Sequence, residues 1–119
     1  MQSDFHRTKK AETGDFLHRV GFSLIFFEKR YCDVLAVKRI NGRQYTLGAE
    51  IEFSVRNLLR NIQRNLQTLG CDGVLVIVPD FQVLGEVARK LSRELAPEFR
   101  NKVGVATFRT LQLLSPEIT

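Results

Sequence analysis

Three carboxylates flank a short turn that can bring them together. Asp33 precedes the dipeptide Asn41-Gly42, and Glu50 and Glu52 follow it. Asn-Gly is the strongest short signal for a hairpin with a two-residue turn. Counting outwards from such a turn places Asp33 directly opposite Glu50 with both side chains on one face, and Glu52 lies two residues further along that face.

Like charges that face each other across a pair of strands destabilise a sheet, so folding alone does not favour this arrangement. Clusters of carboxylate oxygens bind hard divalent cations, and we expect Mg²⁺ or Mn²⁺ here. The alternative is that Lys29, Lys38 and Arg56 neutralise the acids as solvated ion pairs.

The surrounding patterns predict the elements that position these acids. In chain order they indicate a helix over residues 4–19, strands over Phe22–Glu28, Tyr31–Ile40 and Gln44–Phe53, a helix from an N-cap at Ser54 to Gly70, a strand over Gly73–Val78, a helix capped by Asp80 and ending before Pro97, a strand over Val103–Phe108, and a helical turn over Thr110–Leu114. The order predicts one α/β domain over residues 1–119, with an antiparallel meander followed by parallel strands that helices connect.

The motif Asp33…Glu50-Ile51-Glu52 in the order αβββαβ resembles the PD-(D/E)xK nuclease superfamily, which has the restriction-endonuclease-like fold. The segments Cys32–Val37 and Ala49–Ser54 are similar to the core of its small resolvase-like and helicase-associated members. The resemblance covers roughly residues 5–108 and implies an αβββαβ core with a further helix and strand. It also implies metal-dependent hydrolysis of phosphodiester bonds in DNA.

By this resemblance, Asp33 and Glu50 would hold Mg²⁺ together with the backbone carbonyl of Ile51, and Glu52 would orient or deprotonate the attacking water. Glu52 stands where the family usually has lysine, so a catalytically inactive domain that binds nucleic acid or protein is the alternative. The missing positive charge is expected from another helix, and acidic residues of other elements are accessory candidates. The candidates for supplying the positive charge are Lys9, Arg56, Arg60 and Gln63, and the accessory acidic candidates are Glu12 and Glu28.

The positive charge of the chain is concentrated around this motif. The net charge is +5, and residues 29–64 hold eight basic and three acidic side chains, whereas the segments on either side are each neutral. Arg56, Arg60 and Arg64 recur every four residues of the predicted helix, and Asn57, Asn61 and Asn65 form an adjacent stripe. A localised basic surface is typical of proteins that bind a polyanion, so we expect this helix to contact DNA phosphates.

Composition narrows the class of protein further. The chain has 119 residues, of which 44% are hydrophobic and 26% charged, and only two cysteines. We expect a soluble cytoplasmic protein with no membrane segment and no secretory signal. Gly-rich phosphate-binding motifs are absent from the sequence, and His6 and His18 are predicted to be isolated surface residues. A domain of this size covers few base pairs, so cutting both strands of DNA would need a homodimer or a larger multi-domain partner.

Overall fold

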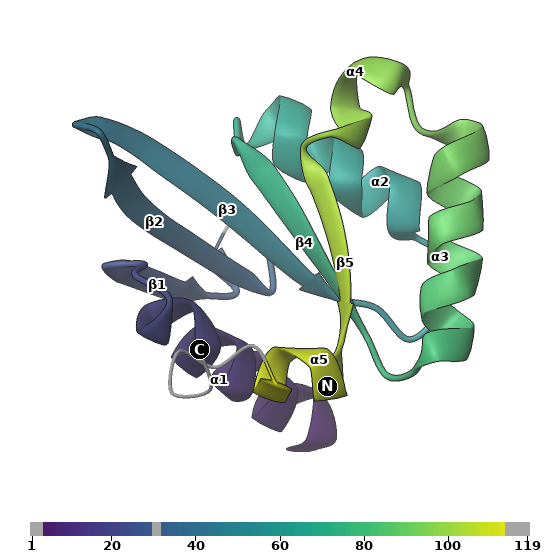
Figure 1. Cartoon of the computed structure of the whole chain (residues 1–119), viewed down its shortest axis with the longest axis horizontal. Coiled ribbons are helices and arrows are strands. Elements are labelled where there is room, and N and C mark those ends of the chain that lie inside the picture. The colour runs from purple at the N-terminus through teal and green to yellow at the C-terminus, as the bar shows by residue number, and fades with distance from the viewer. Residues whose placement is uncertain (1–3, 30–31, 114–119) are drawn as a thin grey trace.

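A five-stranded mixed sheet forms the centre of the molecule (Figure 1). The computed structural model describes residues 4–29 and 32–113. The strands are β1 (Leu24–Phe27), β2 (Val34–Ile40), β3 (Arg43–Ile51), β4 (Gly73–Val78) and β5 (Val103–Thr107), and they lie in that order across the sheet. β1, β2 and β3 are antiparallel, whereas β3, β4 and β5 are parallel. The predicted α/β class with a mixed sheet is therefore confirmed.

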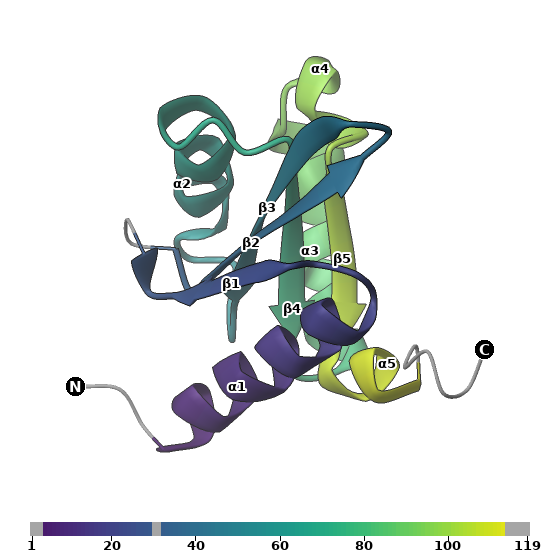
Figure 2. The ribbon, with the colours of Figure 1, turned by 90° about the vertical axis from the view of Figure 1, so that its left-hand side faces the viewer.

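Helices cover the two faces of this sheet (Figures 1 and 2). α1 (Asp4–Arg19) and α5 (Phe108–Leu113) pack on one face, which we call the α1 face. α2 (Leu58–Gln63), the π-helical segment η2 (Arg64–Thr68) and α3 (Phe81–Glu94) pack on the other, which we call the α2 face. The short helix α4 (Pro97–Arg100) connects α3 to β5.

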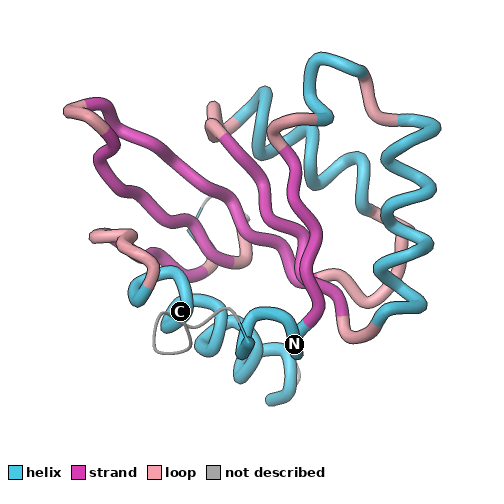
Figure 3. Tube along the Cα trace, viewed as in Figure 1, coloured by secondary structure: helices cyan, strands magenta, loops and turns pink. Residues whose placement is uncertain are grey.

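Each face has its own hydrophobic core. On the α1 face, Leu17 of α1 packs against Val34, Ala49 and Ile77 of the sheet. The core on the α2 face consists of residues from α2, η2 and α3, the segments that follow α3, and strands β4 and β5, and it includes no residue of β1 or β2 among those described. The β1–β2 part of the sheet thus has a helix on one side only, as the tube in Figure 3 also shows.

The hairpin between β2 and β3 has the predicted register. Ile40 pairs with Arg43, and both turn residues, Asn41 and Gly42, have positive φ angles of 52° and 78°, as a two-residue turn of the favoured hand requires. The ladder runs to the pair Val34–Ala49. Asp33 and Glu50, the next residues outwards, are therefore brought opposite each other as the turn predicts.

Two predictions about the segment after β3 are wrong. Ser54 is not the N-cap of a helix: α2 begins at Leu58, and its N-cap residue, Asn57, makes no capping hydrogen bond with its side chain. The chain first turns from the end of β3 onto the α2 face, and Ser54 Oγ accepts a long 3.4 Å bond from the Arg56 amide within that turn. The predicted single helix also becomes π-helical from Arg64 to Thr68.

Elsewhere the predicted elements are present with shifted bounds: Phe108 belongs to α5 and not to the last strand, and the predicted ends at Tyr31 and Leu114 lie outside the described residues. β4 has the predicted bounds, and Asp80 caps α3 by accepting a 2.9 Å hydrogen bond from the Val83 amide. β1, β2 and β5 lie within their predicted ranges, whereas β3 begins at Arg43, one residue before its predicted start. Within the described part of the chain, no helix is both long and apolar enough to cross a lipid bilayer.

Candidate acidic site

An open cleft of about 470 Å³ lies where β3 ends and β2 begins. Its walls come from α1, the segment between β1 and β2, the end of β3, and α2 with η2. The residues that line it are His6, Glu28, Cys32, Asp33, Glu50, Ile51, Glu52, Asn61 and Arg64. The three carboxylates singled out in the sequence therefore share one cleft.

Glu50 is the buried member of this group, with 3% of its surface exposed. Its Oε1 accepts hydrogen bonds from Asn65 Nδ2 at 2.9 Å and from Arg64 Nη2 at 3.1 Å. Burial raises the pKa of Glu50 to about 7, and the nearby charge of Asp33 acts in the same direction, against the opposing effect of Asn65 and Arg64. Glu50 thus takes up or releases a proton near neutral pH.

Asp33 is held from several sides. Its Oδ2 accepts a 2.9 Å hydrogen bond from the Ile51 amide, which fixes the carboxylate against the end of β3. Lys10 Nζ lies 3.6 Å from Asp33 Oδ1, and His6 Nε2 lies 3.8 Å from Asp33 Oδ2. Lys10 is itself only 3% exposed and donates a 2.6 Å hydrogen bond to Glu28 Oε1. A buried ammonium from α1 therefore joins two carboxylates of the cleft.

Glu52 stands just beyond the end of β3. Its amide donates to the carbonyl of Ile77 at 2.9 Å, and its Oε1 accepts a 2.6 Å hydrogen bond from Asn61 Nδ2. Burial, followed by the charge of Asp33, raises the pKa of Glu52, whereas the Asn61 bond lowers it. Glu52 is thus a positioned carboxylate whose proton affinity exceeds that of a free glutamate.

The donor set fits a cation that needs few protein ligands. Among residues 4–29 and 32–113, no group of three or more histidine, cysteine, aspartate or glutamate side chains is arranged to hold a metal ion. Mg²⁺ keeps several waters and binds one or two carboxylates, and Asp33 and Glu50 are two carboxylates that line this cleft. Burial is the main cause of the raised pKa of Glu50, and the opposing effects of Asn65 and Arg64 are smaller than the raising effects of burial and Asp33 together.

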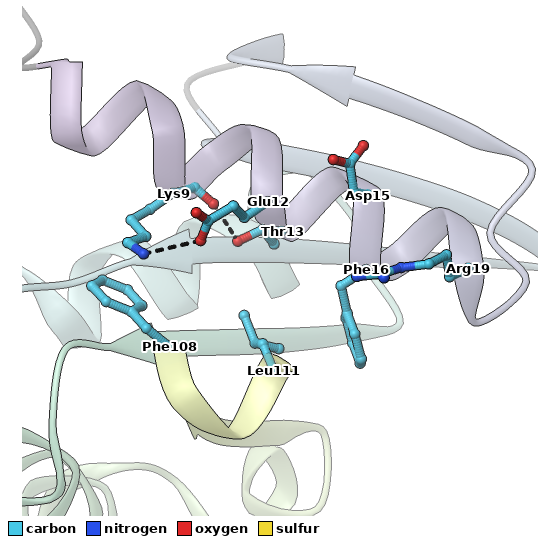
Figure 4. A pocket seen from close by; sticks show the side chains of 8 residues that line it. All are labelled: Lys9, Glu12, Thr13, Asp15, Phe16, Arg19, Phe108 and Leu111. Carbon is cyan, nitrogen blue, oxygen red and sulfur yellow. Dashed lines mark hydrogen bonds and ion pairs between the residues drawn. The ribbon is translucent and has the colours of Figure 1, made fainter. Parts of the chain in front are cut away.

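Lys9 and Glu12 do not belong to this cleft, which corrects their predicted roles. Lys9 Nζ donates to Glu12 Oε2 at 3.0 Å, and it lies 5.3 Å and 5.1 Å from the ring centroids of Phe5 and Phe108. Figure 4 shows this pair in a separate pocket between α1 and α5. The successive residues Lys9 and Lys10 point in different directions because α1 packs along the line of Lys10, Thr13, Gly14 and Leu17.

The three arginines do not form the predicted stripe. Arg56 lies before α2 begins, and the exposed Arg60 donates to Asn57 Oδ1 at 3.1 Å. Arg64 is in η2, where its guanidinium turns to Glu50. Gln63 is exposed and does not line the cleft. Among the described residues, Arg64, which was expected to contact DNA phosphates, is the one arginine of the three that forms an ion pair with these acids.

Sequence reasoning missed four residues of the site: Lys10, His6, Asn61 and Asn65. The helical spacing from Leu17 back through Gly14 and Thr13 to Lys10 was a usable signal, and one further turn leads to His6. Gly14 leaves the space that the Phe27 ring fills: a Cβ there would lie 2.6 Å from Phe27 Cζ. Asn61 and Asn65 were predicted only as part of a stripe of asparagines, and not as hydrogen-bond donors to Glu52 and Glu50.

The alternative, in which cations neutralise the acids, holds in part: among the described ion pairs of these acids the cations are Lys10 and Arg64, and not Lys29, Lys38 or Arg56. Lys29 Nζ lies 4.1 Å from the centroid of the Phe26 ring, and Lys38 Nζ lies 4.7 Å from that of Phe22.

Comparisons with protein-family models, with curated proteins and with solved structures found no match for this chain.

Proposed function

We propose that this protein is a metal-dependent nuclease that hydrolyses phosphodiester bonds in DNA, on a restriction-endonuclease-like version of the α/β fold. One observation carries the proposal: the hairpin register brings Asp33 and the buried Glu50 together in an open cleft. A buried carboxylate beside a second one is costly to the fold unless a cation or a function compensates for it.

Asp33 and Glu50 are the side chains that would hold Mg²⁺ or Mn²⁺, with the backbone carbonyl of Ile51 as a further ligand. When bound there, the ion supplies Lewis acidity toward a phosphate oxygen and acidifies water. Asn65 and Arg64 orient Glu50 through their hydrogen bonds, and the Ile51 amide orients Asp33. These contacts preorganise the pair before any ligand arrives.

Glu52 supplies the proton acceptor in this proposal. Its raised pKa makes Glu52 a stronger base than a free glutamate, and Asn61 fixes the carboxylate that would accept the proton. The positive charge that the family places at this position comes instead from Lys10 on α1 and Arg64 on η2. Arg64 is the more accessible of the two, with 28% of its side chain exposed, and is the better placed to meet a phosphate.

A second candidate is a nuclease-like domain without catalysis that binds nucleic acid or another protein. It is favoured by the internal contacts of the cleft, because each of the three carboxylates already has a partner from α1, α2 or η2. In this alternative, Lys10 and Arg64 are structural cations that make the acids tolerable, and the domain serves assembly.

Metal titration separates the two candidates. We expect Mg²⁺ or Mn²⁺ to bind in a calorimetric titration of the wild type and not to bind to Asp33→Ala/Glu50→Ala. Glu12→Ala is the matched control, since it removes a carboxylate of the neighbouring pocket and should leave metal binding intact. The same proteins are then incubated with labelled duplex, single-stranded and branched DNA.

Metal binding that depends on Asp33 and Glu50, with DNA cleavage that follows it, supports the nuclease. Binding of DNA without cleavage at any metal concentration, equally strong in wild type and double variant, supports the inactive domain.

A further inference from the structure

The end of the β2–β3 hairpin extends beyond both neighbouring strands. β1 pairs only with Val34–Val37 of β2, and β4 pairs only with Leu47–Ile51 of β3. Residues 38–46 therefore form a two-stranded ribbon with its turn at Asn41-Gly42, which we call the hairpin arm. Figure 1 shows this arm at the left-hand end of the sheet, on the opposite side from α3.

The hairpin arm carries only positive charge. From Val34 to Ala49 the sequence contains Lys38, Arg39 and Arg43 and no acidic residue. Arg39 and Arg43 are exposed, and the Arg39 guanidinium donates a 2.8 Å hydrogen bond to the carbonyl of Gly42 in its own turn. Asp72, the acidic residue that lines the pocket beside Arg43, accepts a bond from the Thr46 amide. The arm thus presents two guanidinium groups, one from each face of the ribbon, because Arg43 pairs with Ile40, the neighbour of Arg39.

We propose that the hairpin arm binds the backbone of a DNA duplex at a second point, away from the acidic cleft. This inference rests on the proposed nuclease function for the position of the reacting phosphate. Arg39 is six positions after Asp33, and side chains alternate along a strand, so the register of β2 extended by one residue to Asp33 places the two on one face.

The strand itself sets the distance between the two contacts. Arg39 is six positions after Asp33, and an antiparallel strand rises about 3.4 Å per residue, so the two contacts are about 20 Å apart. Successive base pairs of a duplex are also spaced by about 3.4 Å. With β2 aligned along the duplex axis, which is part of this proposal, the arm meets the duplex about six base pairs from the phosphate in the cleft.

The shape of the arm favours B-form DNA over double-stranded RNA. The major groove of B-DNA admits a two-stranded β-ribbon, whereas that of an A-form duplex is too narrow for protein side chains to read. Arg39 and Arg43 can then reach the phosphates on the rims of the groove, where they supply affinity without sequence preference.

The first test compares a variant that loses two positive charges from the hairpin arm with a variant that loses two from α3. Arg39→Ala/Arg43→Ala changes the arm, and Arg89→Ala/Arg93→Ala removes two exposed arginines from α3 as the matched control. Binding to a fluorescent 20-base-pair duplex is measured by anisotropy over a range of salt concentrations, with a chelator present to prevent cleavage. Loss of two phosphate contacts should lower the slope of log K against log salt by about 1.8, and the control pair should leave it unchanged.

The second test uses duplexes of 4, 8, 12 and 20 base pairs. The wild type should gain affinity between the two shortest duplexes, where the arm first reaches the DNA, and the arm variant should gain much less. Double-stranded RNA of 20 base pairs is the comparison for duplex form, and binding to it should be the same for the wild type and the arm variant. Thermal unfolding followed by circular dichroism should be the same for all variants.

An unchanged salt slope in the arm variant overturns the inference, and so does an equal loss in the α3 control or an equal dependence of RNA binding on the arm. DNA cleavage with an unchanged slope contradicts the arm and leaves the nuclease standing. Binding that depends on the arm in a protein that cleaves no DNA contradicts the nuclease and leaves the arm contact standing.

Discussion

β3 and β4 lie side by side in the sheet, but β4 is entirely apolar and β3 carries a buried charge. β4 is apolar at every position and five of its six residues are buried. β3 has the same buried character at its end, yet Glu50 occupies one of those buried positions and Glu52 follows the strand. The comparison shows that β4 with α3 and β5 supplies packing, whereas the end of β3 retains charges that packing alone does not require.

The contacts around the two strands support this division. β4 is surrounded by the valines and leucines of the core on the α2 face. Glu50 instead needs a buried amide, Asn65, and a guanidinium, Arg64, to remain inside the protein. A buried charge is stabilised only when its partners satisfy it, so this part of the fold is maintained at a cost in stability.

The largest expected effect is on stability, in the α3 region. Leu95 is 2% exposed and follows α3 in the core on the α2 face. Leu95→Ala should lower the free energy of unfolding by about 3 kcal/mol, because it removes buried methyl groups and leaves a cavity. Urea unfolding followed by circular dichroism measures the change.

Leu24→Ala in β1 is the control for this prediction, since Leu24 is 53% exposed and should cost well under 1 kcal/mol. Equal losses for the two variants would show that the stability of the domain does not depend on the β4–α3–β5 region in particular.

The second effect is on activity and leaves stability in place. Glu50→Gln keeps the size of the side chain and removes its charge, so DNA cleavage should fall by more than about 100-fold, since even groups that only orient a metal ligand contribute about 10–100-fold. The free energy of unfolding should be equal to that of the wild type or higher. Single-turnover cleavage and urea unfolding are measured on the same preparation.

Glu12→Gln is the matched control, with cleavage expected to be unchanged. A Glu50→Gln variant that cleaves DNA as fast as the wild type would remove Glu50 from the reacting site, and a strongly destabilised variant would assign it a structural role instead.

The third effect is a pH dependence of stability. The pKa of Glu50 is raised from 4.5 to about 7 in the folded protein, so between these values the folded state holds a proton that the unfolded chain has released. The free energy of unfolding should therefore fall as pH rises through this window, by the order of 1–3 kcal/mol from this residue. Glu52 adds to the fall, since its pKa is also raised.

Unfolding with a chelator present at pH 4.5, 5.5, 6.5 and 7.5 measures this slope in the wild type and in Glu50→Gln. The fall should be smaller in the variant, and Glu12→Gln should retain the slope of the wild type. Identical pH profiles for the wild type and Glu50→Gln would place the titrating groups elsewhere.

The same comparison explains what the sequence could predict. The bounds of β4 and the cap of α3 follow from local signals, an apolar run and an Asp at the N-cap, and the structure confirms both. The meeting of Asp33 and Glu50 was also predictable, because the Asn41-Gly42 turn alone sets the register. Where one local rule determines the geometry, a single sequence is sufficient.

The residues that contact the acids are set by tertiary packing, so the sequence alone could not predict them. Lys10 contacts Asp33 and Glu28 because α1 packs with Gly14 and Leu17 toward the sheet. That face of α1 contains few apolar residues, so the sequence pattern does not identify it as buried. Nothing local marks the π-helical segment in which Arg64 turns to Glu50. Long polar side chains reach their partners across elements, and periodicity in one element does not specify the other.

The smallest expected effect tests this contrast at two predicted helix caps. Asp80→Ala should lower the free energy of unfolding by about 1 kcal/mol, because Asp80 Oδ1 accepts the hydrogen bond of an otherwise unsatisfied Val83 amide. Ser54→Ala should change it by less than about 0.5 kcal/mol, since Ser54 lies in the turn before α2 and makes only a long bond there. Urea unfolding of both variants under one set of conditions measures the difference. A loss of about 1 kcal/mol for Ser54→Ala would mean that the helix begins in solution at Ser54, as its sequence first indicated. The three arginines after it would then be on one helix, and their common contact with DNA phosphates would again be the simpler interpretation.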